Sequence, residues 1–281
     1  MTAALSLLSP AKLNLFLHIT GRRADGYHEL QTLFQMLDWG DLLHFTPNNS
    51  GEVTLGGSDL GIPAEQNLIV RAAKALPRRA EQGVHIDLDK RIPEGGGLGG
   101  GSSNAATTLL AMNQLWELGL DSKALQQLGA ELGADVPVFT AGYTAWAEGV
   151  GEILTPVEMP ESWYLIIAPQ CHISTAEIFS NEQLTRNTSP IKIAAFFEGH
   201  SRNDCQKIVS ELYPEVDNAL KFLENFGEAR LTGTGACCFC SFPDEDSARS
   251  ALAQVPRQMN GFVAKGLNKS PVLDALAGPK D

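Results

Sequence analysis

A run of glycines in the first half of the chain has the composition of a phosphate-binding loop. Residues 93–109 read PEGGGLGGGSSNAATTL, and six of the seven positions from 95 to 101 are glycine. Such a density costs backbone entropy, so it indicates that main-chain N–H groups must come close to a ligand. A helical pattern of apolar residues follows directly, and the N-terminus of a helix attracts anions. The segment therefore predicts a site for a phosphate group.

Two common phosphate loops fit this segment poorly. A Walker A loop needs a lysine directly after its last glycine, whereas Ser102 follows Gly101 here. A dinucleotide-binding pattern can be written on three of the glycines, but residues 90–94 separate them from the preceding strand. Its acidic residue, expected about 20 positions further on at a strand end, would have to be Glu117, which lies late in a predicted helix. A dinucleotide-dependent oxidoreductase therefore stays only as a distant alternative.

A third kind of loop, P-x-x-x-G-L-G-x-x-S-S, surrounds nucleotide phosphates without a lysine. The residues expected to bind ATP in this way are Pro93, Gly95, Gly96, Gly97, Leu98, Gly99, Gly100, Gly101, Ser102 and Ser103. The hydroxyls of Ser102 and Ser103 are suited to donate to phosphate or to contact Mg²⁺. A helix N-cap is the other interpretation of either serine. On these residues alone, a kinase is the favoured function.

Two charged residues outside the loop are candidates for phosphoryl transfer, which needs charge neutralisation and a positioned acceptor hydroxyl. Lys12 lies among apolar strand residues, where an unpaired ammonium is costly; a lysine whose amine reaches water is the alternative. Asp135 stands between Gly133 and Pro137, where a helix N-cap is the common role. Asn14, two residues after Lys12 in a strand, is predicted to project to the same face.

The elements that must position these residues mix strands and helices. Strands are expected at 13–20, 42–47, 52–57, 83–90, 163–169 and 260–271, and within 228–242 around a second glycine turn. Helices are expected at 67–80, from the glycine loop to Gly119, at 121–133, twice within 203–227 with a break at Pro214, and at 245–256, while 178–190 reads as a polar loop. Without strict βαβ alternation the fold class is α+β. Prolines at 156 and 160 predict a boundary between domains 1–157 and 158–281.

Composition excludes several classes of protein. The 281 residues carry a formal net charge of −12, which argues against nucleic acid as a general partner. No apolar run is long enough to span a bilayer, and the N-terminal segment lacks the basic start of a signal peptide. We therefore expect a cytoplasmic protein with no membrane contact. Five cysteines, an odd number crowded into one half, are interpreted as reduced and buried rather than metal-binding.

Motifs along the whole chain resemble one family of small-molecule kinases. PEGGGLGGGSSNAA resembles the second motif of the family that contains galactokinase, homoserine kinase, mevalonate kinase and phosphomevalonate kinase. Other segments resemble, in the same order, members that act on a polyol linked to cytidine diphosphate: residues 9–30, 132–139, 147–152, 231–239 and 260–271. The resemblance spans residues 6–271 and implies a two-domain fold with its active site in the interdomain cleft. It also implies ATP as co-substrate, with Mg²⁺, and a cytidyl diphosphate polyol as the phosphate acceptor.

The resemblance also implies roles for individual residues near the transferred phosphate. Asp135 would be the general base that takes the hydroxyl proton, and Lys12 would pair with it and orient the acceptor and the γ-phosphate. Asn14 would hydrogen-bond the polyol. It places ATP binding in the domain 1–157 and substrate binding in 158–281.

The remaining implied residues surround the substrate. Tyr27 and His28 would supply a stacking face and hydrogen bonds to a cytosine ring. Phe179 would close the other face, with an ordinary core position as the alternative. A turn formed by Gly233, Thr234 and Gly235 would pack against the first glycine loop and bound the diphosphate and polyol, while a β-bulge is the alternative.

Two competing functions differ in what they require. A mevalonate or homoserine kinase would share the glycine loop but would not need Tyr27 and His28. A regulatory nucleotide-binding protein without catalysis would be expected to lack Lys12 or Asp135, and both are present. A monomer and a homodimer are both left open.

Overall fold

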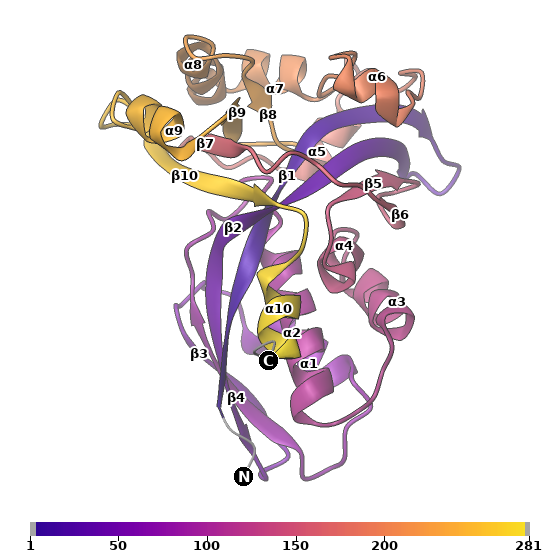
Figure 1. Ribbon diagram of the computed structural model, residues 1–281. Coiled ribbons are helices and arrows are strands. Elements are labelled where there is room, and N and C mark those ends of the chain that lie inside the picture. Colours follow the sequence, from indigo (N-terminus) through magenta and orange to yellow (C-terminus); the bar gives the residue numbers. More distant parts are fainter. Residues whose placement is uncertain (1–3, 279–281) are drawn as a thin grey trace.

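Two long antiparallel strands run through both halves of the molecule (Figure 1). In the computed structural model, which describes residues 4–278, β1 (Leu5–Arg22) pairs with β2 (His28–Asn48). The pairing register shifts after Pro10, after Asn14 and after Ile19. Such irregularities bend and twist a strand. The same strand pair therefore contributes side chains to the cores of both halves of the molecule. Residues 1–3 of the first predicted domain and residues 279–281 of the second lie outside the described residues.

The N-terminal half places helices on one face of a sheet (Figure 1). β4 (Gly83–Asp89) pairs antiparallel with the end of β2, β3 (Val53–Gly57) runs parallel to β4, and β5 (Ala145–Glu148) pairs with both β2 and β6 (Ile153–Pro156). The helices are α1 (Leu68–Ala75), α2 (Gly100–Leu115), α3 (Ser122–Leu132) and α4 (Val136–Ala141), and η1 (Ala64–Gln66) is a short 3-10 turn. Their apolar faces and the sheet share one buried core.

The C-terminal half is a second antiparallel sheet in the order β10-β7-β9-β8, formed by β7 (Trp163–Ala168), β8 (Arg230–Leu231), β9 (Cys238–Phe242) and β10 (Asn260–Leu267). Around it lie α5 (Thr175–Ser180), α6 (Ile193–Phe197), α7 (Gln206–Leu212), α8 (Pro214–Leu223) and α9 (Glu245–Leu252). This half has a separate core.

Strand β10 joins the two halves. It pairs along most of its length with β7, and at its end Gly266 and Leu267 pair with Leu37 and Met36 of β2. The chain then returns to the N-terminal half as α10 (Pro271–Ala277), which contacts β1 and α2 (Figure 1). The division at residue 157 stays a prediction. Helix α10 follows that boundary in the sequence but packs against the N-terminal half.

The predicted α+β class is confirmed. The expected loop at 178–190 is wrong at its start, because residues 178–180 belong to α5, and the helices expected to reach residues 80 and 256 end at Ala75 and Leu252. The largest difference lies in a strand that is buried on both faces. The first half of β2 escaped prediction because polar residues such as Gln31, Thr32 and Gln35 are buried there with the apolar ones, which removes the alternating pattern. The predicted strand to residue 271 ends earlier, at Leu267, because Ser270 caps α10. No helix within residues 4–278 is long and apolar enough to cross a membrane.

Candidate active site

The glycine loop lies between β4 and α2, as predicted. Gly97 and Gly99 have φ of +75° and +74°, a region that L side chains rarely adopt. Gly99 is the N-cap of α2, with no side-chain cap. Both serine N-cap interpretations are therefore wrong: the Ser103 hydroxyl is buried and hydrogen-bonded to Ser9 Oγ at 2.8 Å, and Ser102 lies inside the first turn.

The loop forms one wall of a cavity of about 410 Å³. Of the residues expected to bind ATP, all but Ser103 line it, from Pro93 to Ser102. The lining also includes residues that the sequence interpretation missed: Leu60, Ile62, Asn67, Leu68, Lys90 and Asn104. A lining that combines apolar side chains with a glycine loop at a helix N-terminus suits a nucleotide, whose base is flat and apolar and whose phosphates are anionic.

Lys90 lines the same cavity, and its ammonium is paired with a buried carboxylate. Its Nζ lies 3.2 Å from Asp41 Oδ2, and the fully buried Asp41 also accepts from the main-chain nitrogens of Arg91 and Ile92, both at 2.7 Å. Asn104 Nδ2 donates to the same carboxylate at 2.8 Å. Asp41 thus fixes the chain just before the glycine loop, and the lysine at position 90 was the sequence signal that could have revealed this ion pair.

Lys12 and Asp135 come together, although they are far apart in the sequence. Lys12 is 3% exposed, and its Nζ donates to Asn14 Oδ1 at 2.5 Å and to Gly97 O at 2.9 Å. The same Nζ lies 3.4 Å from Asp135 Oδ2 and over the ring of Phe34. Asp135 precedes α4 but makes no side-chain cap bond. The predicted pairing and the shared face of Lys12 and Asn14 are confirmed, and the alternative of a Lys12 amine that reaches water is wrong. Asp135 does occupy the N-cap position of α4, as the other interpretation had it, but its carboxylate faces Lys12 instead of capping the helix.

A second, smaller cavity of about 160 Å³ lies beside this ion pair. Its lining includes Lys12, Asn14, Thr32, Phe34, Asp135, Phe179, Gly233 and Thr234. Gly97 and Gly99 line this cavity and the nucleotide cavity alike. The glycine loop is therefore the partition between a space suited to a nucleotide and a space that holds a lysine, a carboxylate and an amide.

The second glycine turn packs against the first loop, as the family resemblance implied. Main-chain nitrogens of Ala236 and Cys237 donate to the carbonyls of Gly95 and Gly96, at 3.2 and 3.1 Å. Thr232 Oγ1 donates to Gly97 O at 3.2 Å. Gly233 and Thr234 line the smaller cavity, whereas Gly235 closes the turn through a bond to Thr232 O and does not line it.

Of the three aromatic residues expected around a cytosine ring, the structure brings two together. His28 begins β2, and its ring stacks on Phe179 of α5 with the ring centroids 5.0 Å apart. Phe179 is half-buried and lines the smaller cavity. Tyr27 is 64% exposed in the turn before β2. Burial, with the guanidinium groups of Arg186 and Arg22, lowers the pKa of His28 below its ordinary value.

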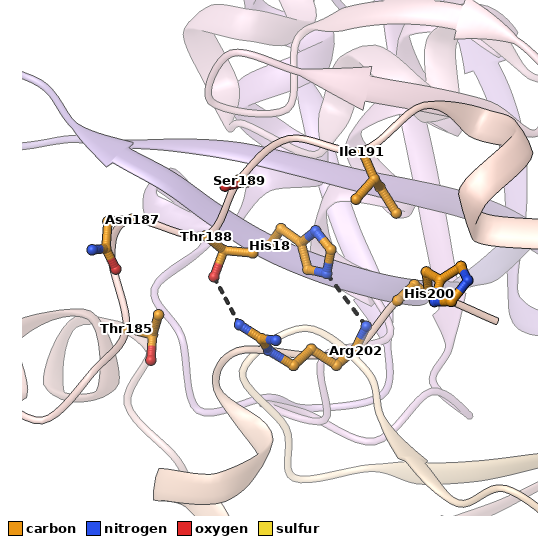
Figure 2. A pocket seen from close by; sticks show the side chains of 9 residues that line it. His18, Thr185, Asn187, Thr188, Ser189, Ile191, His200 and Arg202 are labelled. Atoms are coloured by element: carbon orange, nitrogen blue, oxygen red, sulfur yellow. Dashed lines mark hydrogen bonds between the residues drawn. The ribbon is translucent and has the colours of Figure 1, made fainter.

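A larger cavity of about 600 Å³ contains none of the predicted site residues (Figure 2). It is lined by His18, Thr185, Asn187, Thr188, Ser189, Ile191, His200, Ser201 and Arg202. Arg202 donates to Thr188 Oγ1 at 3.1 Å and from its main-chain nitrogen to His18 Nε2 at 3.4 Å (Figure 2). Because Asp204 already binds the guanidinium at 2.8 Å, the cation in this cavity is neutralised. Size alone therefore does not mark the active site.

The cysteines pack inside the C-terminal half. All but Cys171 are buried, and burial raises the pKa of the Cys237 thiol, next to the glycine loops, to about 12. Within the part of the chain that the structure describes, no group of three or more His, Cys, Asp or Glu side chains is arranged to hold a metal ion.

Comparison with known proteins assigns this geometry to a family. The family model for the GHMP kinases N terminal domain matches residues 67–143, and that for the GHMP kinases C terminal matches residues 182–261. The chain belongs to the GHMP kinase family. The predicted family and fold are thereby confirmed, and a GHMP kinase uses ATP as its co-substrate.

Individual GHMP kinases match along almost the whole chain. The 4-diphosphocytidyl-2-C-methyl-D-erythritol kinase of Pseudomonas aeruginosa (strain LESB58) is 59% identical over 272 residues, covering 96% of this chain and 96% of its own length. The enzyme of the same name from Hahella chejuensis is 55% identical over 285 residues, covering 97% and 96%. A crystal structure of 4-(cytidine 5'-diphospho)-2C-methyl-D-erythritol kinase is 32% identical with a TM-score of 0.81, covering 93% of this chain and 99% of that one. A mevalonate kinase at 17% identity shares the fold with a TM-score of 0.70, covering 94% and 100%.

Proposed function

We propose that this protein transfers the γ-phosphoryl group of ATP to the 2-hydroxyl of 4-diphosphocytidyl-2-C-methyl-D-erythritol, in the non-mevalonate route to isoprenoid precursors. The names of relatives that are 55–59% identical support this substrate. The observation that carries the reaction type is the Lys12–Asp135 pair, at 3.4 Å, beside the glycine loop that separates the two cavities. Because Gly97 and Gly99 line both cavities, the γ-phosphate of a nucleotide in one cavity would reach an acceptor hydroxyl in the other at these two glycines.

The chemical step follows from the two charged groups. The Asp135 carboxylate accepts the proton of the hydroxyl, the hydroxyl oxygen forms a bond to the γ-phosphorus, and the bond from that phosphorus to the β–γ bridging oxygen breaks, which releases ADP. The Lys12 ammonium offsets the negative charge on the transferring group. Hydrogen bonds from its Nζ to Asn14 Oδ1 and Gly97 O hold the ammonium in position.

Mg²⁺ belongs to the same proposal as a partner of the ATP phosphates. This ion keeps several waters and takes few protein oxygens, and when bound it would neutralise charge on the phosphates. The Ser102 hydroxyl, on the wall of the nucleotide cavity, fits that demand. Ser103 fits it less well because its hydroxyl is turned inward to Ser9.

The substrate's nucleoside end is proposed to lie along the aromatic residues that continue from the smaller cavity. Phe179 offers a ring face, and His28 offers ring nitrogens. Tyr27 is exposed directly before the first residue of β2 and is proposed to cover the bound ring. The acceptor cavity draws Asn14 and Thr32 from one half of the molecule and Phe179 and Gly233 from the other. Substrate binding is therefore proposed to involve both predicted domains.

A coupled ADP-release assay tests the proposal. ATP is offered with the diphosphocytidyl polyol, mevalonate, homoserine or galactose, and turnover of the first alone is expected. Turnover of mevalonate but not of the cytidyl compound would refute the substrate assignment.

The role of Asp135 is tested in the same assay. We expect Asp135→Asn to lower kcat by about 100-fold or more, because it removes a positioned proton acceptor, and to leave ATP binding near the wild-type value. Asp121→Asn is the matched control: Asp121 caps α3 through Ala124 N at 2.8 Å, away from both cavities, and asparagine caps equally well. Loss of ATP binding as severe as loss of turnover in Asp135→Asn would contradict the assigned role.

A further inference from the structure

Strand β1 contains a bulge beside the smaller cavity. Asn14 pairs with Phe34 of β2. The next pair joins Leu17 to Thr32, so residues 15–16 of β1 stand opposite a single residue of β2. Two residues against one is the arrangement that defines a β-bulge. The bulge therefore lies between Asn14 and Leu17, which both line the smaller cavity.

The bulge decides which side chains of β1 face that cavity. Side chains of a regular strand alternate between two faces, and one extra residue moves all later side chains to the other face. Lys12 and Asn14 line the cavity, and after the bulge so does Leu17, whereas Phe16 and His18 do not. A regular strand would point the Phe16 ring, instead of Leu17, to the side on which Asn14 lies. The shape of the acceptor side of the site thus depends on the bulge.

Two side chains hold the main-chain carbonyls of the bulge. Arg230 Nη1 donates to Leu15 O at 2.7 Å and also to Ser201 Oγ at 2.9 Å. Thr32 Oγ1 donates to Phe16 O. The Arg230 side chain is only 13% exposed, and a hydrogen bond from a charged donor is stronger than one between neutral groups. The guanidinium is therefore the firmer of the two anchors.

A chain of hydrogen bonds runs from the bulge to the Lys12 ammonium. Thr32 Oγ1, which donates to Phe16 O, accepts from Asn14 Nδ2 at 2.9 Å. Asn14 Oδ1 in turn accepts from Lys12 Nζ at 2.5 Å. A shift of the bulge would therefore displace the amide and the ammonium that the proposed reaction uses.

Arg230 also ties the bulge to the second glycine turn. It begins β8, and Thr232, two residues later, accepts from Asn14 N at 3.0 Å through its Oγ1. Side chains two residues apart in an extended segment point the same way, so both reach β1. Gly233 and Thr234 follow directly and line the smaller cavity. Arg230 and Thr232 thus join two walls of that cavity, β1 and the turn.

The Arg230 side chain itself lies outside the smaller cavity. Together with Leu15 and Glu228 it lines another cavity, of about 210 Å³, which shares no lining residue with the smaller one. Its Nη2 lies 2.7 Å from Oε1 of Glu228, a side chain that is 68% exposed. Arg230 therefore does not touch a bound acceptor, and a small cation from solution could enter the space that its guanidinium occupies.

We propose, resting on the proposed function, that Arg230 is a positioning residue whose guanidinium holds the bulge of β1 and thereby places Asn14 and Lys12 against the acceptor hydroxyl. Misplacement of such groups by about 1 Å can slow turnover by about 100-fold. The nucleotide cavity is lined by none of Arg230, Asn14 and Lys12, so ATP binding should not depend on the bulge.

Amide hydrogen exchange tests the bulge without any substrate, on the full-length protein. The main-chain nitrogens of Asn14 and Leu17 donate to Thr232 Oγ1 and Arg202 O, both at 3.0 Å. We expect Arg230→Ala to speed exchange in a peptide covering residues 13–19 by at least about tenfold, because exchange follows local opening, and to leave residues 245–252 unchanged. Wild-type exchange rates in residues 13–19 would overturn the proposal, whatever the substrate proves to be.

Steady-state kinetics test the effect on turnover. Arg230→Ala is expected to lower kcat by about 10- to 100-fold, with KM for ATP within about twofold of wild type. Guanidinium chloride at about 20 mM, far below the molar concentrations that unfold proteins, should raise kcat of this variant several-fold, and sodium chloride should not. Arg230→Lys, which keeps a charged donor, should retain more activity than Arg230→Ala.

Arg249→Ala is the matched control. Arg249 also pairs with a glutamate, through its Nε and Glu245 Oε1 at 2.6 Å, but on the exposed side of α9. This variant should behave as wild type, with and without guanidinium. If Arg230→Ala does not fold, Arg230→Met, which keeps the apolar stem without a donor, replaces it in both measurements, and Arg230→Lys remains the rescue.

Three kinetic outcomes overturn the role of Arg230. The first is an unchanged kcat in Arg230→Ala, and the second is a rise in KM for ATP as large as the fall in kcat. The third is a loss of turnover that neither guanidinium nor Arg230→Lys relieves, because that pattern would mean a general structural role. If the wild type does not phosphorylate the diphosphocytidyl polyol while exchange in residues 13–19 responds as expected, the substrate assignment fails and the bulge keeps its anchor.

Discussion

Replacing Gly97 by alanine tests whether the packing of the second glycine turn against the first glycine loop stabilises the protein and its nucleotide cavity. A Cβ atom at Gly97 would lie 2.2 Å from Thr232 O and 3.1 Å from Thr232 C, both main-chain atoms. No side-chain rotation relieves such a contact, and the φ of +75° is itself unfavourable for alanine. The loop and the turn would have to move apart, and Gly97 O would leave its two donors.

The expected cost follows from these contacts. The left-handed backbone conformation costs alanine about 1–2 kcal/mol. Gly97 O accepts from the Lys12 ammonium at 2.9 Å and from Thr232 Oγ1 at 3.2 Å. A hydrogen bond to a charged group contributes about 1.5–3 kcal/mol and a neutral one about 0.5–1.5 kcal/mol. We expect Gly97→Ala to lower the free energy of unfolding by about 3–6 kcal/mol and Tm by on the order of 10 °C.

The assay compares thermal unfolding and KM for ATP in Gly97→Ala and Gly101→Ala. Gly101 lies in the first turn of α2, and a Cβ there would make an ordinary contact of 3.5 Å with Leu68 Cδ1. Alanine suits a helix better than glycine does, so the control should unfold within about 1 kcal/mol of wild type. If Gly97→Ala unfolds at the wild-type temperature with an unchanged KM for ATP, the loop does not depend on Thr232 and the reasoning fails.

Two further predictions concern histidines. His28→Ala should raise KM for the cytidyl substrate at least about tenfold while leaving KM for ATP within about twofold; equal changes in steady-state kinetics would remove His28 from the substrate site. Burial lowers the pKa of His18 from its ordinary 6.5, so the unfolded chain binds a proton that the folded chain does not, and stability is lost as the pH falls below about 6.5, by at most about 1.4 kcal/mol per pH unit. His18→Gln should remove this part of the pH dependence in urea unfolding between pH 7 and 5, and parallel curves for the two proteins would contradict it.

Local sequence patterns, each only a few residues long, predicted much of the fold. Asp121 and Gly133 were expected to begin and end a helix, and they flank α3, where Asp121 accepts from Ala124 N. The glycine loop was placed correctly before α2 for the same reason, because glycine density and helix onset are local properties. The Ser270–Pro271 pair was also a local signal, since proline is favoured at the first helical position, but it was read as the end of a strand.

Contacts between distant residues could not be predicted from such patterns. Nothing near Lys90 shows that Asp41, which fixes its segment, lies 49 residues earlier. Arg186 stood in a segment that reads as a polar loop, and its partner His28 is 158 residues away. The Lys12–Asp135 pair was expected only through the family resemblance, because each residue alone fits an ordinary structural role. The candidate site depends on contacts between residues that are far apart in the sequence, and the pattern of a single sequence does not reveal such contacts.

The return of α10 to the N-terminal half affects how this chain can fold during synthesis. Val272 is 1% exposed and belongs to the same core as residues of β2, α1 and α2. Leu273 lies against Gly142, at the end of α4. The ribosome makes residues 271–277 long after β1 and β2, so the core around the nucleotide cavity stays incomplete until that helix emerges. A chain that ends before residue 271 would leave this apolar surface exposed, and chaperones and proteases that bind exposed apolar surface would recognise it.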